Sequence, residues 1–447
     1  MSVVAVGLLV SPACAAEPTA AAPLKVDTGD TAWVMLGAAL VMLMTPGLAF
    51  FYGGLVRRKN VLSVLMQCFM ILCLISIQWM LFGYSLAFGP DAGGHGIIGD
   101  LSWAGLNGVG AEPFAAYSKT VPHQVFMIFQ MMFAVITPAL IIGAFAERIR
   151  FSAFCVFSLL WTTLVYDPVA HWVWSADGFM GVLRTGGWGA LDVAGGTVVH
   201  INAGMAALAA ALYLGRRQGF PDKMSPPHNL PFAVLGAALL WFGWFGFNAG
   251  SALSANGLAG SAFVSTHIAS AAAGLTWALL DWIKHRKPTT LGIITGAVGG
   301  LVAITPAAGY VTPMGAVLVG VGAGVFPWLA VTYIKVRMGY DDSLDAFGVH
   351  GVGGIWGAIA TGLFATIAVN ESLHVGGGCG LFYDNYNPAQ LLTQIKAVGL
   401  TMGYSFVMSF GLFWLVDKFF KLRVTDHEER VGLDLTQHKE AGYTVID

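Results

Sequence analysis

Residues 192–204 read Asp192-Val193-Ala194-Gly195-Gly196-Thr197-Val198-Val199-His200-Ile201-Asn202-Ala203-Gly204, with an aspartate at a helix start and a histidine inside the apolar span that follows. A second stretch 150 residues later, Asp345-Ala346-Phe347-Gly348-Val349-His350-Gly351, again places an aspartate ahead of a histidine and an apolar span. Ionisable side chains at membrane depth are costly and usually line a path for a polar solute. The repeated pattern therefore predicts a membrane route lined by His200 and His350.

The composition is that of a membrane protein. Of the 447 residues, 56% are hydrophobic and 10% are charged, and the mean hydropathy is +0.71, far outside the soluble globular range. The net charge of -2 argues against a nucleic-acid partner, because no basic face is available to neutralise phosphates. The five cysteines show no CxxC spacing, so we infer neither zinc nor redox chemistry.

Apolar segments of roughly 20 residues, the length that crosses a bilayer, recur along the chain. They predict an all-α polytopic membrane protein with eleven transmembrane helices. The expected spans are 31–55, 61–88, 123–146, 151–173, 193–214, 231–254, 261–283, 289–308, 312–335, 346–369 and 389–416.

Basic residues predict the orientation. Of the 22 lysines and arginines, 18 follow the odd-numbered spans and only Lys25, Lys119, Arg184 and Lys396 fall elsewhere. Short cytoplasmic loops collect such residues, so the N-terminus is expected outside and the C-terminus in the cytoplasm. We expect a signal peptide over 1–16, an exported tail over 17–30, a transmembrane domain over 31–416 and a cytoplasmic regulatory tail over 417–447.

The two histidine stretches open the predicted fifth and tenth helices. Each repeat has an odd number of spans, five, so the second repeat begins on the opposite side of the membrane from the first. Helices 6–10 are therefore expected to be inverted relative to helices 1–5, with a long eleventh helix added. His200 and His350 would then approach each other near the midplane. An interhelix hydrogen bond that serves only packing is the alternative, worth about 0.6 kcal/mol. No third ligand has metal spacing, and no nucleophile and base converge, so we expect no metal, no cofactor and no enzyme.

Other polar and aromatic residues have two interpretations each. Asp192 and Asp345 could simply cap helix starts, or Asp192 could also stabilise a cation at the pore mouth. Phe129 and Phe133 share one helix face, which is more often packing than a gate. Trp174 is either an interface anchor or a cation-π wall, and Ser251 either binds a small donor or bonds back to its own helix. His267 is expected to be a satisfied structural group.

Together these stretches resemble the ammonium transporter family, which comprises ammonium transporters, methylammonium permeases and Rhesus proteins. The resemblance is closest to the bacterial ammonium transporters and covers about residues 30–440. It rests on the 192–204 stretch and on four further motifs. These are Pro46-Gly47-Leu48-Ala49-Phe50-Phe51-Tyr52-Gly53-Gly54-Leu55, Gly143-Ala144-Phe145-Ala146-Glu147-Arg148, Trp244-Phe245-Gly246-Phe247-Asn248-Ala249-Gly250-Ser251 and Phe347-Gly348-Val349-His350-Gly351. Val193 departs from the family pattern, which usually has an aromatic residue after the aspartate.

The resemblance implies a role for each matching residue. Trp174, Ser251 and Phe129 would form an outer recruitment site for ammonium, with Phe133 and Phe247 as the aromatic gate beneath it. His200 and His350 would be the twin histidines of the pore, and Asp192 would support deprotonation and the recruitment site. Asp345 is expected, from its own place on the inner side five residues before His350, to be a supporting residue. The family also implies a homotrimer in the bacterial cytoplasmic membrane, surrounded by membrane lipid. A PII-type regulatory protein at the cytoplasmic face is a possible partner, and the tail from Glu428 to Asp434 resembles the family's regulatory tail.

The resemblance implies an ammonium transporter that works by deprotonation. Ammonium resembles potassium in size and charge, but only ammonium can lose a proton and cross an apolar constriction as neutral ammonia. Two alternatives stay open. A Rhesus-like passive gas channel is disfavoured by Trp174 and Ser251. An ammonium sensor signalling through its tail is disfavoured because 25 to 30 residues after the last span leave no room for a signalling domain.

Overall fold

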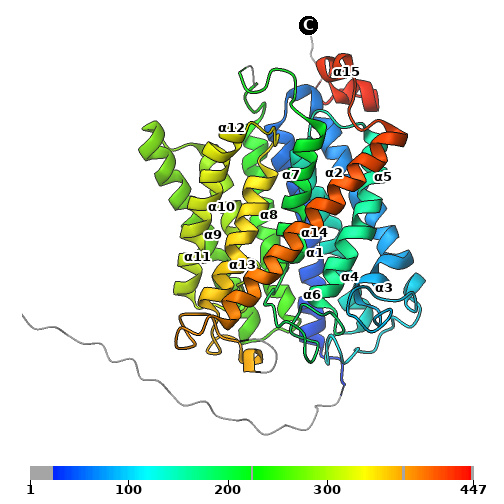
Figure 1. The fold of residues 1–447 in the computed structure, drawn as a ribbon, viewed down its shortest axis with the longest axis vertical. Helices are drawn as coiled ribbons and strands as arrows, with labels where there is room; N and C mark the ends of the chain where they lie inside the picture. The colour runs from blue at the N-terminus through cyan, green and yellow to red at the C-terminus, as the bar shows by residue number, and fades with distance from the viewer. Residues whose placement is uncertain (1–23, 223–224, 375–377, 444–447) are drawn as a thin grey trace, which may run out of the picture.

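The computed structural model describes residues 24–222, 225–374 and 378–443, and within them the chain forms a bundle of helices with no β-strand (Figure 1). The predicted signal peptide 1–16 and residues 17–23 of the predicted exported tail lie outside the described residues. The α-helices are α1 (Thr28–Leu55), α2 (Val61–Gln78), α3 (Tyr84–Phe88), α4 (His123–Phe145), α5 (Phe151–Trp161), α6 (Asp167–Trp174), α7 (Asn202–Leu214), α8 (Leu230–Ala249), α9 (Gly257–His285), α10 (Thr290–Ile304), α11 (Pro313–Leu329), α12 (Lys335–Met338), α13 (Gly353–Phe364), α14 (Ala389–Phe420) and α15 (Asp426–Val431).

Several of these helices join through π-helical turns into longer membrane spans. The turns are η2 (Trp79–Gly83), η4 (Thr162–Tyr166), η5 (Gly196–Ile201), η7 (Ala330–Ile334) and η8 (Phe347–Val352), with a further one, η10 (Asp434–His438), in the C-terminal tail. Short 3₁₀ turns lie at η1 (Arg58–Asn60), η3 (Ala104–Leu106), η6 (Gly250–Ala252) and η9 (Glu371–His374). A π-helical turn inserts one extra residue and often marks a functional site. Here η5 and η8 contain His200 and His350.

Within the described residues, ten helices are long and apolar enough to cross a membrane, and their positions agree with ten of the predicted spans. The predicted eighth span, 289–308, is helical only over α10, whose 15 residues end at Ile304. A helix of that length reaches about 22 Å, short of the roughly 30 Å hydrocarbon core. Turns continue from Thr305 to Tyr310, so eleven full-length spans are not established by helix length.

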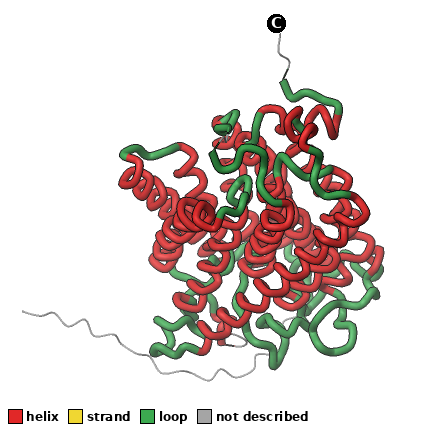
Figure 2. The backbone as a smooth tube through the Cα atoms, turned by 45° about the horizontal axis from the view of Figure 1, so that its top comes forward, coloured by secondary structure: helices red, strands yellow, loops and turns green. Residues whose placement is uncertain are grey.

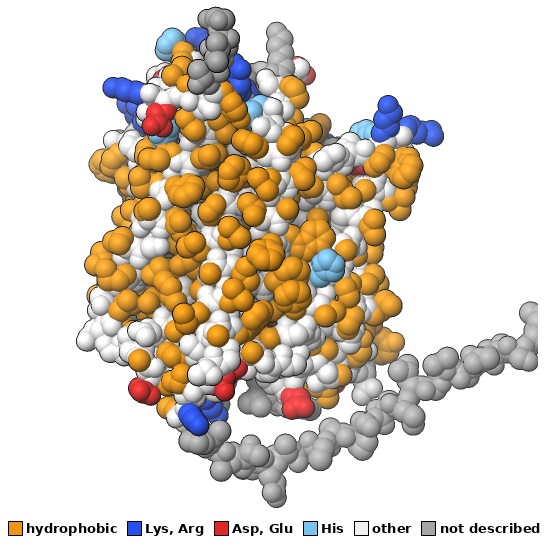
Figure 3. Space-filling view, turned by 180° about the vertical axis from the view of Figure 1, so that it is seen from behind, with side chains coloured by type: hydrophobic (Ala, Val, Ile, Leu, Met, Phe, Trp, Pro, Cys, Tyr) orange, Lys and Arg blue, Asp and Glu red, His pale blue; other side chains and the backbone are white. Residues whose placement is uncertain are grey.

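The surface agrees with membrane burial. Hydrophobic side chains cover the middle of the molecule, whereas charged side chains gather at its two ends (Figure 3). Loops also lie mainly at the two ends (Figure 2). The core sits around α4, most of which is buried, and α14 packs against α7 and α13 on the outside of the bundle.

The two histidine segments run in opposite directions. The chain enters η5 and α7 from Asp192, beside a cavity at one end, and α7 ends at Leu214, whose carbonyl accepts a hydrogen bond from Arg423 at the other end. In the second half α13 ends near Tyr310, whose carbonyl accepts from the Thr366 amide and which lines the same cavity as Asp192. This antiparallel placement is the arrangement that an inverted repeat requires.

Candidate functional site

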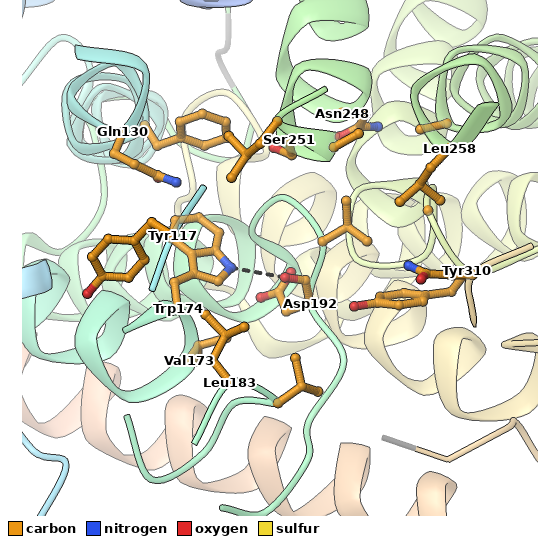
Figure 4. Close-up of a pocket in the computed structure, with 18 of the residues that line it drawn as sticks. Tyr117, Gln130, Val173, Trp174, Leu183, Asp192, Asn248, Ser251, Leu258 and Tyr310 are labelled. Atoms are coloured by element: carbon orange, nitrogen blue, oxygen red, sulfur yellow. Dashed lines mark hydrogen bonds between the residues drawn. The ribbon is translucent and has the colours of Figure 1, made fainter. Parts of the chain in front are cut away.

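A cavity of 220 Å³ opens at the end of the molecule where α6 ends and η5 begins, and we call it the outer cavity. Trp174, Gln130, Asn248, Ser251, Asp192 and Tyr310 are among its lining residues (Figure 4). Aromatic faces of Phe126, Phe133 and Tyr117 supply much of the rest. No lysine, arginine or histidine is among the described residues that line it. Aromatic faces without competing cations suit the binding of a small cation.

Two residues that line the outer cavity have a buried amide oxygen without a hydrogen-bond partner. Gln130 Oε1 and Asn248 Oδ1 are both buried and unsatisfied, while Asn248 Nδ2 donates to Thr266 Oγ1 at 2.9 Å. Buried acceptors of this kind are costly unless a donor reaches them. Ser251 Oγ donates back to the Phe247 carbonyl at 2.8 Å, so its lone pairs remain available to a donor in the cavity.

Phe133 and Phe247 close the inner side of the outer cavity. Their ring centroids lie 4.4 Å apart, and both side chains are almost completely buried. Trp174 meets Phe133 edge to face at 5.7 Å and donates its Nε1–H to the Asp192 carbonyl at 2.9 Å. That bond fixes the tryptophan ring above the two phenylalanines. A solute that moves inward must therefore pass an apolar aromatic constriction.

The two histidines lie directly beyond the constriction. Their Nδ1 atoms are 3.3 Å apart and their rings are nearly parallel, with centroids 5.4 Å apart and an angle of 16° between the planes. One ring must carry the shared proton on Nδ1 and the other must accept it. His200 also stacks on Trp244 and Phe247, and His200 Nε2 has no partner. A narrow space of 10 Å³ lies beside the two imidazoles, and apart from them and the indole of Trp244 its lining residues are apolar.

Glycines bring the two histidine segments into contact. A Cβ built on Gly204 in α7 would lie 2.2 Å from the Cα of Gly351 in η8, so no larger residue fits at this crossing. Gly195, just before η5, has φ of 116°, a conformation that favours glycine. The glycine-rich motifs are therefore requirements of geometry.

Asp192 holds the start of the first histidine segment. Its carboxylate accepts hydrogen bonds from the backbone amides of Gly195, Gly196, Thr197 and Val198 at 2.7, 2.6, 2.8 and 3.3 Å, and from the Thr197 hydroxyl. A carboxylate at this position satisfies the free amides of a helix start. The capping interpretation is therefore confirmed for Asp192.

The second histidine segment is capped by a different aspartate from the one expected. Asp342, not Asp345, accepts from the amides of Ala346 and Phe347 at 3.1 and 2.8 Å. Asp345 instead pairs with Lys335 and adopts a positive φ of 62°. Asp342 precedes His350 by eight residues, as Asp192 precedes His200, so the repeat spacing identifies Asp342 as the counterpart.

On the far side of His350 a second cavity of 570 Å³ opens, which we call the inner cavity. His350 lines both this cavity and the narrow space beside the histidines. Its charged lining residues include Arg216, Arg217 and Lys335, together with Asp281 and Asp345. The outer cavity, the aromatic constriction, the histidine pair and the inner cavity thus follow one another through the molecule.

Most of the predicted site residues meet along this path, but Phe129 does not line it. Phe129 is fully buried behind Phe133, at a centroid distance of 5.0 Å, and an added Cβ on Gly250 would touch its ring. Phe126, Gln130 and Phe133 form the cavity face of α4 instead. Among the described residues no three histidine, cysteine, aspartate or glutamate side chains gather as a metal site requires.

Comparisons with known proteins identify the family. The model of the Ammonium Transporter Family matches residues 32–443. An ammonium transporter of Bacillus subtilis is 52% identical over 415 residues, covering 93% of this chain and 98% of the relative. The crystal structure of Saccharomyces cerevisiae Mep2 superposes with a TM-score of 0.82 at 36% identity, covering 90% of this chain and 88% of that one.

A solved structure named Sensor Amt Protein also matches, with a TM-score of 0.81, 30% identity, and coverage of 92% of this chain and 98% of that one. The relatives named above as transporters agree with the expectation that this chain is not an enzyme. Both the resemblance of the sequence motifs and the all-helical membrane fold are confirmed. The chain belongs to the Ammonium Transporter Family.

Proposed function

We propose that this protein moves ammonium into the cytoplasm by recruiting the cation in the outer cavity, removing its proton, and passing neutral ammonia along His200 and His350. The observation that carries the proposal is the pair of buried imidazoles, Nδ1 to Nδ1 at 3.3 Å, in an otherwise apolar constriction. An ion has no ligand set there that could replace its water, whereas ammonia can exchange hydrogen bonds with the rings.

Recruitment is supported by the chemistry of the outer cavity. Ammonium has four donors, and the Ser251 hydroxyl keeps free lone pairs beside the Trp174 ring, with Gln130 and Asn248 in the same cavity wall. A cation over an aromatic face gains about 0.5 to 2 kcal/mol, depending on desolvation. Asp192 lines the cavity, but five donors already occupy its carboxylate, so its support is the long-range attraction of a fixed negative charge.

Proton loss ahead of the constriction would separate ammonium from potassium. Phe133 and Phe247 leave no polar group at the narrowest point, so a charge would have to cross without compensation. Potassium cannot shed its charge. We propose Phe133 and Phe247 as the gate and the two histidines as the conducting pair, with reprotonation in the inner cavity.

The direction of transport follows from the orientation. We propose that the outer cavity faces the outside of a bacterial cytoplasmic membrane and that the end bearing the C-terminal tail is cytoplasmic. Arginines and lysines concentrate at that end, which agrees with the bias of short cytoplasmic loops. Residues 417–447 would then form the cytoplasmic tail.

The tail is bound to the loops of that end, as a regulatory segment could be. Glu429 accepts from the Gln218 amide at 2.7 Å and pairs with Arg423 at 2.9 Å. Asp434 accepts from the Ser63 amide at 2.8 Å, and Asn60 accepts from the Leu433 amide at 2.8 Å. A PII-type protein that contacts these loops would reach both the tail and the inner cavity.

We propose that the protein assembles as a homotrimer. One supporting feature is an exposed aromatic face on α8 and α9, where Phe245 and Phe263 stack at 3.9 Å. His267, expected to be a satisfied structural group, is exposed on this face, 5.3 Å from Trp241 between ring centroids, and makes no hydrogen bond to any described residue. An imidazole in lipid is costly, so a second copy is a better neighbour than hydrocarbon.

Two other functions predict different measurements. A passive gas channel would move ammonia without recruiting the cation. A sensor would bind ammonium and signal through the tail, and the match to Sensor Amt Protein keeps this possibility in view. The outer cavity has the Ser251 hydroxyl beside the Trp174 ring and no lysine, arginine or histidine among its described lining residues, which favours a transporter over the gas channel.

The test is current and lumenal pH across proteoliposomes that hold the purified protein, after a pulse of ammonium and after a matched pulse of potassium. We expect an ammonium response that potassium does not evoke. A current would mean that charge crosses, and alkalinisation without current would mean a neutral conduit. A potassium response of equal size would contradict selective transport, and silence in both readouts would favour sensing. Trp174→Leu should weaken the apparent ammonium affinity about twofold to thirtyfold.

A further inference from the structure

Asp167 is a buried aspartate in the membrane that the proposed pathway does not use. It begins α6, seven residues before Trp174, inside the span Phe151–Trp174, and it is fully buried. Among the described residues it takes part in no ion pair. Its carboxyl group has a single side-chain partner, Gln78, whose Nε2 donates to Oδ2 at 2.8 Å.

Two oxygens of this pair have no partner. Asp167 Oδ1 and Gln78 Oε1 are both buried and unsatisfied. Gln78 Nε2 also donates to Thr163 Oγ1 at 3.2 Å, so both of its hydrogens are in use. An ionised carboxylate that lies in the membrane with one hydrogen bond and no cation would be very costly. One added proton satisfies both orphan oxygens, because a protonated carboxyl group is a donor and Gln78 Oε1 is an acceptor.

We propose that Asp167 is a neutral carboxylic acid that forms a reciprocal acid–amide pair with Gln78, and that this pair positions the two walls of the outer cavity. The proton stays on the carboxyl group throughout transport, and Asp167 is a positioning residue that acts through Gln78. The inference rests on the proposed function only in taking the outer cavity as the ammonium site.

The pair joins two membrane spans where each makes a π-helical turn. Gln78 immediately precedes η2, and Asp167 immediately follows η4. The segments that continue from these turns are α3, which carries Phe88, and α6, which carries Trp174, and both side chains line the outer cavity. Because π-helical turns change the direction of the residues that follow, a bond between them fixes the relative positions of Phe88 and Trp174.

Gly83 supplies the space for the amide. A Cβ built on Gly83 would lie 2.5 Å from Gln78 Oε1 and 2.7 Å from Nε2. Gly83→Ala would therefore displace the Gln78 side chain from Asp167 without removing either polar partner. Gly83→Ala therefore breaks the hydrogen bond between Asp167 and Gln78 while the Asp167 carboxyl group stays in place.

The test compares Asp167→Asn with Asp167→Leu in ammonium-evoked proteoliposome transport. Asparagine keeps one donor and one acceptor in the same shape, so we expect transport within about twofold of the parent. Leucine leaves Gln78 Oε1 and one Nε2 hydrogen of Gln78 without a partner in the membrane, and we expect the apparent ammonium affinity to fall about tenfold or more. Gln78→Leu should lower the apparent affinity by about as much as Asp167→Leu. The double variant Asp167→Leu with Gln78→Leu should recover part of the loss, because neither polar group of the pair is then left without its partner.

An infrared spectrum of the parent protein tests the protonation of Asp167 directly, without a transport assay. At neutral pH the parent should show the carbonyl stretch of a protonated carboxylic acid that Asp167→Asn removes and Gly83→Ala shifts. Absence of that band, or loss of transport in a folded Asp167→Asn protein, would overturn the inference, since it would mean that the carboxylate charge or a moving proton is required. If the parent moves no ammonium but keeps the band, the proposed function fails and the acid–amide pair stands.

Discussion

The outer and inner cavities lie at opposite ends of one path, yet their electrostatics differ. The outer cavity is lined by aromatic, aliphatic and uncharged polar side chains together with Asp192, and none of its described lining residues is cationic. The inner cavity has Arg216, Arg217 and Lys335 in its wall, with two aspartates beside them. A cation is thus favoured at the outer end and meets like charges at the inner end. This difference supports a pathway in which the proton leaves the substrate before the histidines.

The two helix starts that carry the histidines also differ, in the number of hydrogen bonds that their capping aspartates accept. Asp192 accepts five hydrogen bonds, four of them from backbone amides, whereas Asp342 accepts two. Lys335 also donates to the Asp342 carbonyl and pairs with Asp345. The first helix start is thus stabilised by one carboxylate, that of Asp192. The second is stabilised by Asp342 together with the ion pair of Lys335 and Asp345. The repeated scaffold is supported differently at its two ends.

The largest effect is expected from Asp192→Ala. It leaves four amides and a hydroxyl without their acceptor, and at about 1 kcal/mol or more for each the loss approaches 5 kcal/mol. Asp342→Ala removes two such bonds, so we expect about 2 kcal/mol. Thermal unfolding of the two purified variants in the same detergent measures the difference. Equal losses would contradict the asymmetry of the two starts.

The next effect concerns the charged network beneath the inner cavity. Glu147 accepts from Arg57 Nε at 2.9 Å and from Arg217 Nη1 at 3.2 Å, and Arg217 also pairs with Asp341 at 2.8 Å. Glu147→Gln takes the carboxylate partner from Arg57 and leaves Arg217 with Asp341 alone, which should cost about 3 kcal/mol. The same unfolding assay checks it, with Glu440→Gln at the exposed tail as a control. A loss no larger than that of the control would show that the network does not hold the inner end together.

Acid should weaken this network. Burial by itself raises the pKa of Glu147, but the charges of Arg57 and Arg217 outweigh it and hold the pKa below its usual range. Burial likewise raises the pKa of Asp341, and hydrogen bonds and charge from Arg217 reverse that shift. Groups with a lowered pKa in the folded state stabilise it above their unfolded pKa values, and this contribution disappears as the pH falls through the folded values. Melting temperatures should therefore fall below about pH 4, and less steeply in Glu147→Gln. An identical acid response in parent and variant would rule out Glu147 as a source.

The smallest effect is expected from Asp345→Asn. Its ion pair with Lys335 is partly exposed, at 27% for the aspartate side chain, and such pairs contribute about 0.5 kcal/mol. We expect ammonium transport close to that of the parent and a melting temperature nearly unchanged. If transport fell as far as in Asp342→Ala, Asp345 would have the supporting role that the sequence first suggested.

The sequence alone predicted the membrane spans well because hydropathy and span length reflect the bilayer directly. The expected span 123–146 agrees with α4, His123–Phe145, to within one residue. The expected 289–308 fails at Ile304, because the residues that follow remain apolar while the chain turns. Composition cannot distinguish an apolar helix from an apolar turn that is buried in the bundle.

The site was predicted less completely. The pairing of His200 with His350 follows from the repeat, but the choice of Asp345 over Asp342 neglected the eight-residue spacing that the first copy already shows. Phe129 was placed in the outer site because the resemblance to the family implies it there, together with Trp174 and Ser251. Which face of α4 meets the cavity depends on packing against α1, α2 and α7, and no local sequence pattern carries that information. The Asp167–Gln78 pair depends on two π-helical turns, which periodicity does not reveal.

The central claim is that His200 and His350 conduct as one unit. The most direct measurement is the ammonium-evoked response of proteoliposomes that carry His200→Ala, His350→Ala or both, with protein amounts matched. If the shared proton between the two Nδ1 atoms is the conducting element, either single change should remove most of the response, and the double change should be no worse than the stronger single one. Transport that survives both changes, or losses that simply multiply, would contradict the account.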